Sequence, residues 1–198
     1  MTERSGSVSR GTAETQISVS LSIDGKGASS CETGLPFFDH MLDQIARHAG
    51  LELQVFAKGD LEVDAHHTVE DVGIAIGEAL NQALGDRSGV QRFASIAVPL
   101  DEALIEAVVD ISGRPFLAFE VPFAADTPGL GTPPFDPQLT EEFLRAVVTN
   151  AGMTVHINKR AGRNTHHVVE ATFKAFSRAL RAAMQIQGGG IPSTKGVL

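Results

Sequence analysis

The predicted elements of this chain occur in the same order twice, and this duplication constrains the fold more than any other feature of the sequence. Alternating apolar and polar residues predict half-buried strands, and apolar residues three or four apart predict helices. In the first half these patterns place strand, helix, strand and helix at residues 15–23, 40–50, 51–59 and 66–86. In the second half they place the same elements at residues 103–113, 140–152, 153–162 and 166–184. We therefore expect two copies of one structural unit.

The joints between the elements match as well. Residues 49–53 align with residues 151–155, where a glycine ends each short helix, and the turn at residues 24–26 aligns with residues 112–114. Asp39 is the predicted N-cap of the first short helix. These matches predict an α+β fold built by internal duplication of a β-β-α-β-α-like half. Each half is expected to be a small sheet packed by helices.

The two halves are expected to form one compact domain with short extensions. The predicted parts are a flexible N-terminus at residues 1–10, a first half-repeat at 11–95, a second half-repeat at 96–187 and a C-terminal tail at 188–198. Residues 121–138, an insertion in the second half, are rich in proline and glycine and predict a surface loop. The tail carries hydroxyl and ammonium groups that could fold over a ligand in its own subunit or in a neighbour.

Composition excludes several classes of protein. The chain has 198 residues, 42% of them hydrophobic, which is enough for a packed core. Its formal net charge of −8 argues against a nucleic-acid partner, which requires a basic surface. Cys31 is the single cysteine, so ligands for a metal must come from histidine and carboxylate. Without an apolar run long enough for a membrane or a secretory signal, we expect a soluble cytoplasmic protein.

Two His-His-x-x-Glu motifs begin the two long predicted helices. Residues four apart lie on one helix face, so His66 with Glu70, and His166 with Glu170, can each bind one ion. The second histidine of each motif points about 100° away from the first. If the two helices face each other, each ion also receives the second histidine of the opposite motif. A single His-His pair at a helix start is ordinarily a polar turn, but two copies with identical spacing favour metal.

The duplication also indicates one further ligand for each ion, because His40 on the first short helix aligns with Glu142 on the third helix. One ion is then expected to be bound by His40, His67, His166 and Glu170. The other is expected to be bound by His66, Glu70, Glu142 and His167. Imidazole and carboxylate without sulfur suit Mn, Fe, Co or Zn, and four protein ligands leave positions open on an octahedral ion, which favours Mn²⁺.

The same motifs carry a resemblance to a known family. The segments PFFDHMLDQIARH, DAHHTVEDVGIAIGEAL, SGRPF, HHVVEATFKAFSRALR and IPSTKGVL, in this order, resemble imidazoleglycerol-phosphate dehydratase of histidine biosynthesis. The resemblance covers nearly the whole chain. It implies a duplicated α+β fold and dehydration of imidazoleglycerol phosphate to imidazoleacetol phosphate with two Mn²⁺ ions per active site. It also implies a homo-oligomer of 24 subunits with active sites between subunits.

The family's metal scheme agrees with the ligand sets above except at Glu142, where many members have histidine. A carboxylate can still bind Mn²⁺, so we expect an altered affinity. The resemblance places the substrate contacts on Glu14, His40, His48, His66, Glu70, Arg92, Arg114, His166, Lys174, Ser193, Thr194 and Lys195. Guanidinium and ammonium groups match a phosphate dianion, so the arginines, Lys195 and the Ser193 hydroxyl form the expected phosphate site.

Glu14 is the candidate catalytic residue for proton transfer, with a metal-bound water or a residue of the ligand sphere as alternatives. Its repeat counterpart Glu102 is either a vestige of the duplication or a second contributor. His156, within a strand, is expected to have a packing role, and Arg178 and Arg181 are expected to be helix-face charges. Two other classes of function remain open from the residues alone. They are a metal-dependent hydrolase of a phosphorylated metabolite and a non-catalytic metal-binding shell protein.

Overall fold

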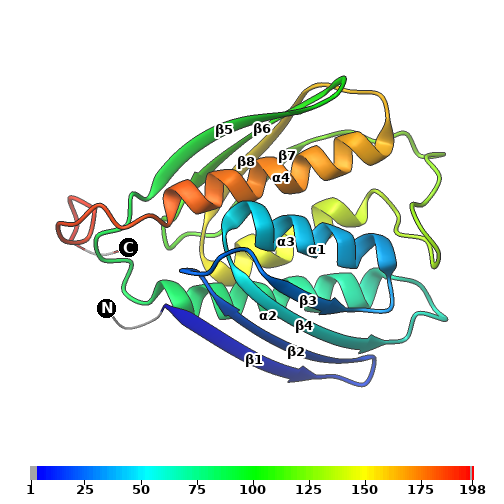
Figure 1. Cartoon of the computed structure of the whole chain (residues 1–198), viewed down its shortest axis with the longest axis horizontal. Coiled ribbons are helices and arrows are strands. Elements are labelled where there is room, and N and C mark those ends of the chain that lie inside the picture. The colour runs from blue at the N-terminus through cyan, green and yellow to red at the C-terminus, as the bar shows by residue number, and fades with distance from the viewer. Residues whose placement is uncertain (1–3, 197) are drawn as a thin grey trace.

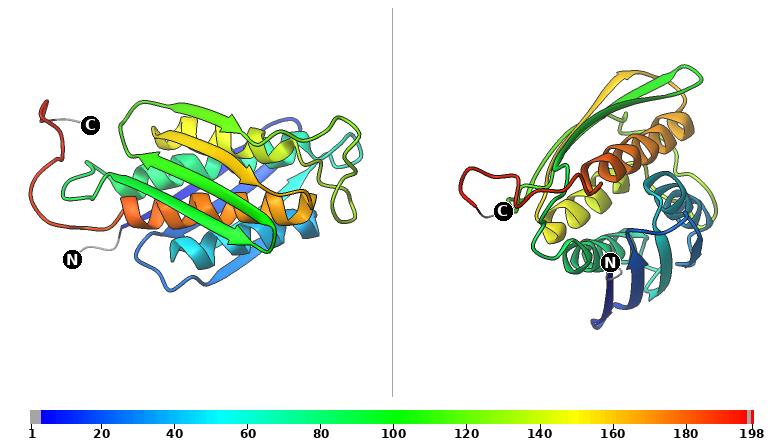
Figure 2. Two further views of the ribbon diagram at one scale, coloured as in Figure 1. Left: turned by 90° about the horizontal axis from the view of Figure 1, so that it is seen from above. Right: turned by 60° about the vertical axis from the view of Figure 1, so that its left-hand side comes forward.

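The structure, a computed structural model, describes residues 4–196 and residue 198. Two four-stranded sheets form the outer layers, and four helices lie between them (Figures 1 and 2). The first half contains β1 (Ser5–Gly11), β2 (Thr15–Ser22), β3 (Ser29–Glu32), α1 (Pro36–Ala49), β4 (Glu52–Gly59) and α2 (His66–Leu84). The second half contains β5 (Phe93–Leu100), β6 (Ala103–Asp110), β7 (Phe116–Glu120), α3 (Leu139–Ala151), β8 (Thr154–Ala161) and α4 (Thr165–Ala183).

The topology confirms the internal duplication and the α+β class. The strand order is β1-β2-β4-β3 in one sheet and β5-β6-β8-β7 in the other. In both sheets the first three strands of that order pair antiparallel and the last pair is parallel. The apolar side chains of β2, among them Ile17, Val19 and Leu21, are buried against the helices, while the intervening residues face outward. This alternation is what a sheet with one covered face requires.

Each half has three strands before its first helix, one more than the β-β-α-β-α-like unit expected and two more than the ranges located by periodicity, so the repeated unit is β-β-β-α-β-α. The expectation of a flexible N-terminus is wrong for the described residues, because β1 pairs with β2 from Ser5↔Ser22 to Gly11↔Gln16. The first half therefore begins at Ser5, and β5 opens the second half at Phe93. The segment SGSVSRG carries one large apolar residue, so its tertiary pairing rather than its own pattern makes it a strand. Residues 1–3 of the expected N-terminus, and residue 197 of the tail, lie outside the described residues.

The first short helix also begins earlier than expected. Pro36 occupies its first turn, where a missing N–H is harmless, and Leu35 rather than Asp39 is the N-cap. The Asp39 carboxylate instead accepts hydrogen bonds from the backbone N–H and the hydroxyl of Thr33, at 2.9 and 2.7 Å. These bonds tie the β3–α1 joint together. Gly50 ends the helix as expected, with a left-handed φ of 73°.

The helices pack across the boundary between the halves, α2 against α3 and α4 against α1. Each long helix therefore has the short helix of the other half as its main partner, rather than the other long helix. Gly73 and Gly77 make the α2–α3 packing close: a Cβ at Gly77 would lie 2.6 Å from the Val147 carbonyl oxygen. This exchange of partners brings the start of α4 beside α1, and the start of α2 beside the loop before α3.

The insertion at residues 121–138 is not only a surface loop. Phe135 is fully buried, and its ring stacks on Phe38 at a centroid distance of 5.8 Å and lies tilted against Phe37 at 5.5 Å. Phe38 in turn contacts Phe143 of α3 edge to face. The loop is thus anchored in an aromatic cluster that joins the two halves. None of the described helices is long and apolar enough to cross a membrane.

Candidate functional site

Three predicted ligands converge at the start of α4. His40 on α1 and His166 and Glu170 on α4 offer ligand atoms that all lie within 4.8 Å of one another. Glu170 Oε2 lies 3.0 Å from His166 Nε2 and 3.5 Å from His40 Nε2. Phe37 packs edge to face against His166, with ring centroids 5.3 Å apart, and limits how that imidazole can turn. No other described residues form a comparable group of three or more.

The Glu170 carboxylate is held ionised despite its position. Burial is the largest influence and raises its pKa, but hydrogen bonds from Lys174 and His166 and the positive charge of Lys174 outweigh it. The net pKa of Glu170 therefore lies below its ordinary value. An ionised carboxylate beside two exposed imidazoles, with no sulfur, is a donor set that fits a divalent ion of the Mn–Zn series.

A second group occupies the matched position in the first half. His66 Nε2 lies 3.7 Å from Glu70 Oε2. His66 and Glu142, from the start of α3, line one cavity of about 460 Å³ beneath the insertion loop. By the repeat alignment Glu142 takes the place of His40, but among the described residues the ligand atoms of this group do not converge as those of His40, His166 and Glu170 do. The group offers one imidazole and two carboxylates rather than two imidazoles and one carboxylate.

The second histidine of each motif belongs to neither cluster of this chain. His67 Nδ1 lies 3.0 Å from Asp60 Oδ2, and His167 Nδ1 lies 2.8 Å from Glu102 Oε2. Hydrogen bonds with these carboxylates raise the pKa of both imidazoles. The expectation that each ion receives the second histidine of the opposite motif is therefore not met within one chain. The reason is the helix pairing, because α2 packs on α3 and α4 packs on α1.

The predicted phosphate residues gather around the tail. Arg92, Arg114, Ser193, Thr194 and Lys195 line one cavity of about 580 Å³. The Arg92 guanidinium donates to both carboxylate oxygens of Asp110, at 2.7 and 3.3 Å, and to the Pro192 carbonyl at 2.8 Å. The tail thus folds beside the arginines of its own chain. Arg114 is the more available cation, because 66% of its side chain is exposed.

The basic cavity and the His40 cluster lie at opposite ends of α4. Arg92 donates its backbone N–H to the carbonyl of Ala183, the last residue of that helix, whereas His166 lies in its first turn. At 1.5 Å per residue the helix from Thr165 to Ala183 is about 27 Å long. Figure 1 shows α4 running from the end where α1 begins to the end where the tail lies. A molecule must span most of this length to contact both ends within one chain.

The remaining predicted residues lie between or beside these centres. Lys174 Nζ lies 2.6 Å from Glu170 Oε1, so it reaches the first cluster from one turn along α4. The His48 ring lies 3.2 Å from Gln44, and burial, with the nearby charge of Lys174, lowers its pKa. Glu14 is 53% exposed, with Oε2 3.7 Å from His67 Nδ1. His156 packs against Phe116 on the outer sheet face, as its predicted packing role requires.

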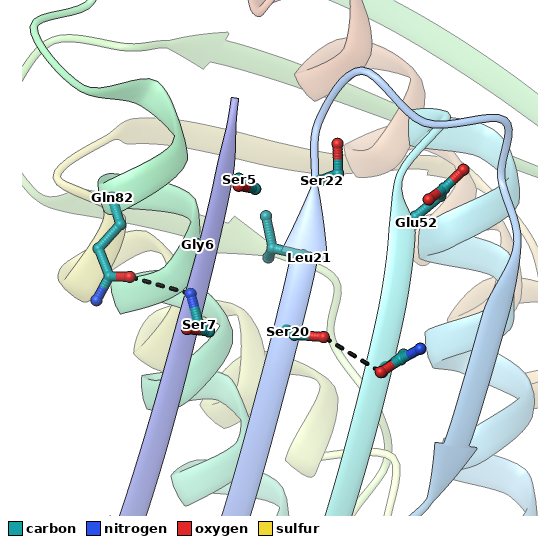
Figure 3. A pocket seen from close by; sticks show the side chains of 9 residues that line it. Ser5, Gly6, Ser7, Ser20, Leu21, Ser22, Glu52 and Gln82 are labelled. Atoms are coloured by element: carbon teal, nitrogen blue, oxygen red, sulfur yellow. Dashed lines mark hydrogen bonds between the residues drawn. The ribbon is translucent and has the colours of Figure 1, made fainter. Parts of the chain in front are cut away.

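A further cavity contains none of the predicted residues. Figure 3 shows this groove of about 380 Å³ on the outer face of the first sheet, with serines of β1 and β2 along it. Gln82 accepts a hydrogen bond from the backbone N–H of Ser7 at its edge. The side chains that line the groove are mainly hydroxyls and amides, so it has no evident chemistry.

Comparison with known proteins assigns the chain to a family. A family model described as imidazoleglycerol-phosphate dehydratase matches residues 33–180. The chain belongs to the imidazoleglycerol-phosphate dehydratase family. An imidazoleglycerol-phosphate dehydratase of Anaeromyxobacter sp. (strain Fw109-5) is 58% identical over 195 residues, which are 98% of this chain and 94% of that protein. One of Acidiphilium cryptum (strain JF-5) is 53% identical over 98% of this chain and 99% of its own length.

Solved structures of imidazoleglycerol-phosphate dehydratases share the fold. The enzyme from Staphylococcus aureus subsp. aureus N315 matches with a TM-score of 0.82 and 42% identity, over 92% of this chain and 99% of that chain. The Pyrococcus furiosus enzyme, in complex with (S)-C348, matches with a TM-score of 0.81 and 34% identity. This match covers 96% of this chain and 100% of that chain. The chain is thus a dehydratase of histidine biosynthesis by family, with the fold that the resemblance implied.

Sequence reasoning missed two residues that shape the site. Asp60 lies seven positions before His67 in a loop, where an acidic residue carries no distinctive pattern. Phe37 is adjacent to other aromatic core residues, so its contact with His166 could not be distinguished from ordinary packing. The matched spacing of Glu14 and Glu102 before their strands was the one available signal for carboxylates near the paired histidines.

Proposed function

We propose that this chain dehydrates imidazoleglycerol phosphate to imidazoleacetol phosphate in L-histidine biosynthesis, using two Mn²⁺ ions per active site. The observation that carries the proposal is the convergence of His40, His166 and Glu170 from the two halves of a chain in this family. An imidazole substrate needs an ion that accepts nitrogen ligands and keeps positions open. Two imidazoles and one carboxylate leave such positions on an octahedral ion.

The two ions are assigned to the two matched clusters. One would be held by His40, His166 and Glu170, and the other by His66, Glu70 and Glu142. His67 and His167 would complete the two sites from a second copy of the chain, which gives each ion four protein ligands. The proposed assembly is the homo-oligomer of 24 subunits that the family resemblance implies.

Two features of the single chain support a site shared between subunits. The second histidines, His67 and His167, contact Asp60 and Glu102 rather than the ligand atoms of the clusters. Ala183, which contacts Arg92 of the phosphate site, lies about 20 Å along α4 from Glu170 and about 26 Å from His166, and both distances are much longer than a phosphorylated glycerol chain. A complete site therefore needs the metal cluster of one copy and the tail of another.

Two Mn²⁺ ions held by these residues would favour the deprotonated form of the substrate imidazole, whose electrons help the hydroxyl group leave from the carbon bonded to the ring. The chain supplies the rest. Arg114 and Lys195 bind the phosphate dianion, and Ser193 adds a hydroxyl donor, which fixes the substrate in one orientation. Glu14, which is exposed beside His67, would take the proton from the neighbouring carbon of the glycerol chain. Loss of this proton and of the hydroxyl group on the ring-bearing carbon, together one water, leaves the enol of imidazoleacetol phosphate.

The deciding experiment incubates the purified, Mn²⁺-loaded protein with imidazoleglycerol phosphate and follows products by mass spectrometry and phosphate assay. Imidazoleacetol phosphate with no free phosphate is the expected result. Release of inorganic phosphate would instead identify a metal-dependent hydrolase. Mn²⁺ binding and assembly without any product would identify a non-catalytic shell protein. Size-exclusion chromatography with light scattering measures the subunit number in the same sample.

A further inference from the structure

Each second histidine of the two motifs is held at Nδ1 by a carboxylate from a loop. For His167 the partner is Glu102, whose Oε2 lies 2.8 Å from Nδ1. The other oxygen, Oε1, accepts from the backbone N–H groups of Asn164 at 2.8 Å and Arg163 at 3.2 Å. Glu102 is thus fixed at both oxygens, and it joins the β5–β6 turn to the start of α4.

In the first half, the carboxylate that contacts the second histidine comes from a different position of the repeat. Both oxygens of Asp60 lie near His67 Nδ1, at 3.2 and 3.0 Å. Asp60 follows β4 directly, and the residue that follows β8 is Gly162, which has no side chain. Glu14 precedes β2 as Glu102 precedes β6, yet its oxygen is 3.7 Å from His67 Nδ1, beyond hydrogen-bond distance. The duplicated carboxylates therefore differ in what they contact.

From this difference, and on the proposed function, we infer that Glu102 and Asp60 are positioning residues that keep the proton on Nδ1 and the lone pair on Nε2 of His167 and His67. Asp60 has replaced Glu14 in this role and leaves the Glu14 carboxylate available for proton transfer. Glu102 is then neither a vestige of the duplication nor a second group for proton transfer. Its role is to orient His167, the proposed metal ligand.

The chemistry follows from the two nitrogens of imidazole. A neutral ring has one N–H, and an ionised carboxylate can only accept, so the N–H turns to the carboxylate. The opposite nitrogen then carries the lone pair that a metal requires, and its ring plane is fixed. Glu102 is suited to this task, because both of its oxygens accept hydrogen bonds, one from His167 and the other from the backbone of Asn164 and Arg163.

The variant Glu102→Gln should reverse the direction of the hydrogen bond at His167 Nδ1 with little change in the shape of the side chain. The amide oxygen is retained by the two backbone donors, Arg163 and Asn164, so the amide NH₂ must face His167 Nδ1. An NH₂ group donates, so the neutral ring must move its proton to Nε2, the proposed ligand atom. Glu106→Gln is the matched control, because Glu106 pairs with Arg160 on the outer sheet face.

The first readout is the histidine tautomer in metal-free protein, measured with ¹⁵N-histidine labelling and magic-angle-spinning NMR at mildly alkaline pH. One ring should change from the Nδ1–H to the Nε2–H form in Glu102→Gln and none in Glu106→Gln. The second readout is calorimetric Mn²⁺ titration, where Glu102→Gln should weaken one class of site by about 10- to 100-fold. Unchanged tautomers and unchanged affinity in a folded Glu102→Gln variant would overturn the inference.

The replacement of Glu14 by Asp60 has its own test. Glu14→Gln should abolish turnover but leave the His67 tautomer as in wild type, because Asp60 still accepts from Nδ1. Asp60→Ala combined with Glu14→Gln should release His67 to a mixture of tautomers. A His67 signal that changes in Glu14→Gln alone would assign the anchor to Glu14 and refute the exchange. The tautomer readout needs neither metal nor turnover, so its result stands apart from the success or failure of the proposed dehydration.

Discussion

Lys174 Nζ lies 2.6 Å from Oε1 of Glu170, whose other oxygen, Oε2, lies 3.0 Å from His166 Nε2. All three side chains project from α4, so one carboxylate joins an ammonium group to the cluster at the helix start. Because its two oxygens have separate partners, Glu170 is restrained in orientation as well as kept ionised.

Replacing Lys174 with Met should weaken Mn²⁺ binding at the His40 cluster by about 10-fold, because Glu170 loses its orienting partner and part of the charge that keeps it ionised. Calorimetric titration measures the change. Lys159→Met is the control, since Lys159 lies on the outer sheet and contacts only the Pro122 carbonyl, at 3.4 Å. Equal affinity in the two variants would show that Lys174 acts on the substrate alone.

The two arginines of the basic cavity should behave differently when each is replaced with Ala. Arg114→Ala removes an exposed phosphate donor. The KM for imidazoleglycerol phosphate should therefore rise at least 10-fold, which corresponds to about 1.4 kcal/mol or more of lost binding free energy, and the stability of the fold should not change.

Arg92→Ala should raise the KM as well. It should also lower the free energy of unfolding by about 1–3 kcal/mol, because Asp110 and the Pro192 carbonyl lose their hydrogen-bond donor. Urea titration and steady-state kinetics separate the two effects. A loss of stability in Arg114→Ala would contradict this division.

Gly77→Ala should destabilise the protein although alanine favours helix by about 1 kcal/mol. The new Cβ would lie 2.6 Å from the Val147 carbonyl oxygen, so α2 and α3 must separate, at a cost of about 1–3 kcal/mol. Gly11→Ala is the control, because a Cβ there meets no atom within 4 Å. Thermal unfolding of the two variants measures the difference, and a stabilised Gly77→Ala protein would show that the helices are not in close contact.

The stability contributed by ionised Glu102 should depend on pH in a defined window. Its pKa is lowered from 4.5 to about 2 in the folded chain, so the folded state binds the proton less tightly than the unfolded state. The contribution is therefore complete above pH 4.5 and is lost as the pH falls from 4.5 toward 2. Urea unfolding of metal-free wild type and Glu102→Gln should give free energies that converge over that window. Parallel curves would contradict the lowered pKa.

The sequence predicted the elements whose apolar residues have a clear period. Residues such as Ile17 and Val19 of β2, or Val69 and Val72 of α2, are buried as that period requires. β1 and β3 were missed because their segments, SGSVSRG and SSCE, contain too few apolar residues to reveal a strand. Their strand structure comes from hydrogen bonding, of β1 to β2 and of β3 to β4, which the apolar pattern of the segment itself does not encode.

The candidate site was predictable to the extent that it depends on helical spacing and repeat alignment. Counting through the repeats paired His40 with the second motif, and the structure brings His40 beside His166 and Glu170. The same reasoning joined His67 to that group, and within one chain His67 lies outside it because α2 packs on α3 rather than on α4. Helix pairing across the halves depends on the close approach at Gly73 and Gly77, and periodicity gives no information about it.

The length of α4 has a consequence for mixtures of two inactive variants of this protein. On the proposed function, the cluster at its start and the basic cavity at its end are too far apart to serve one substrate, so each chain would contribute half of two different sites. A chain that lacks His166 and a chain that lacks Arg114 would both be inactive alone. Assembled together, some of their sites would combine an intact metal end with an intact phosphate end. Such a mixture should recover part of the activity, which is complementation between two defective alleles.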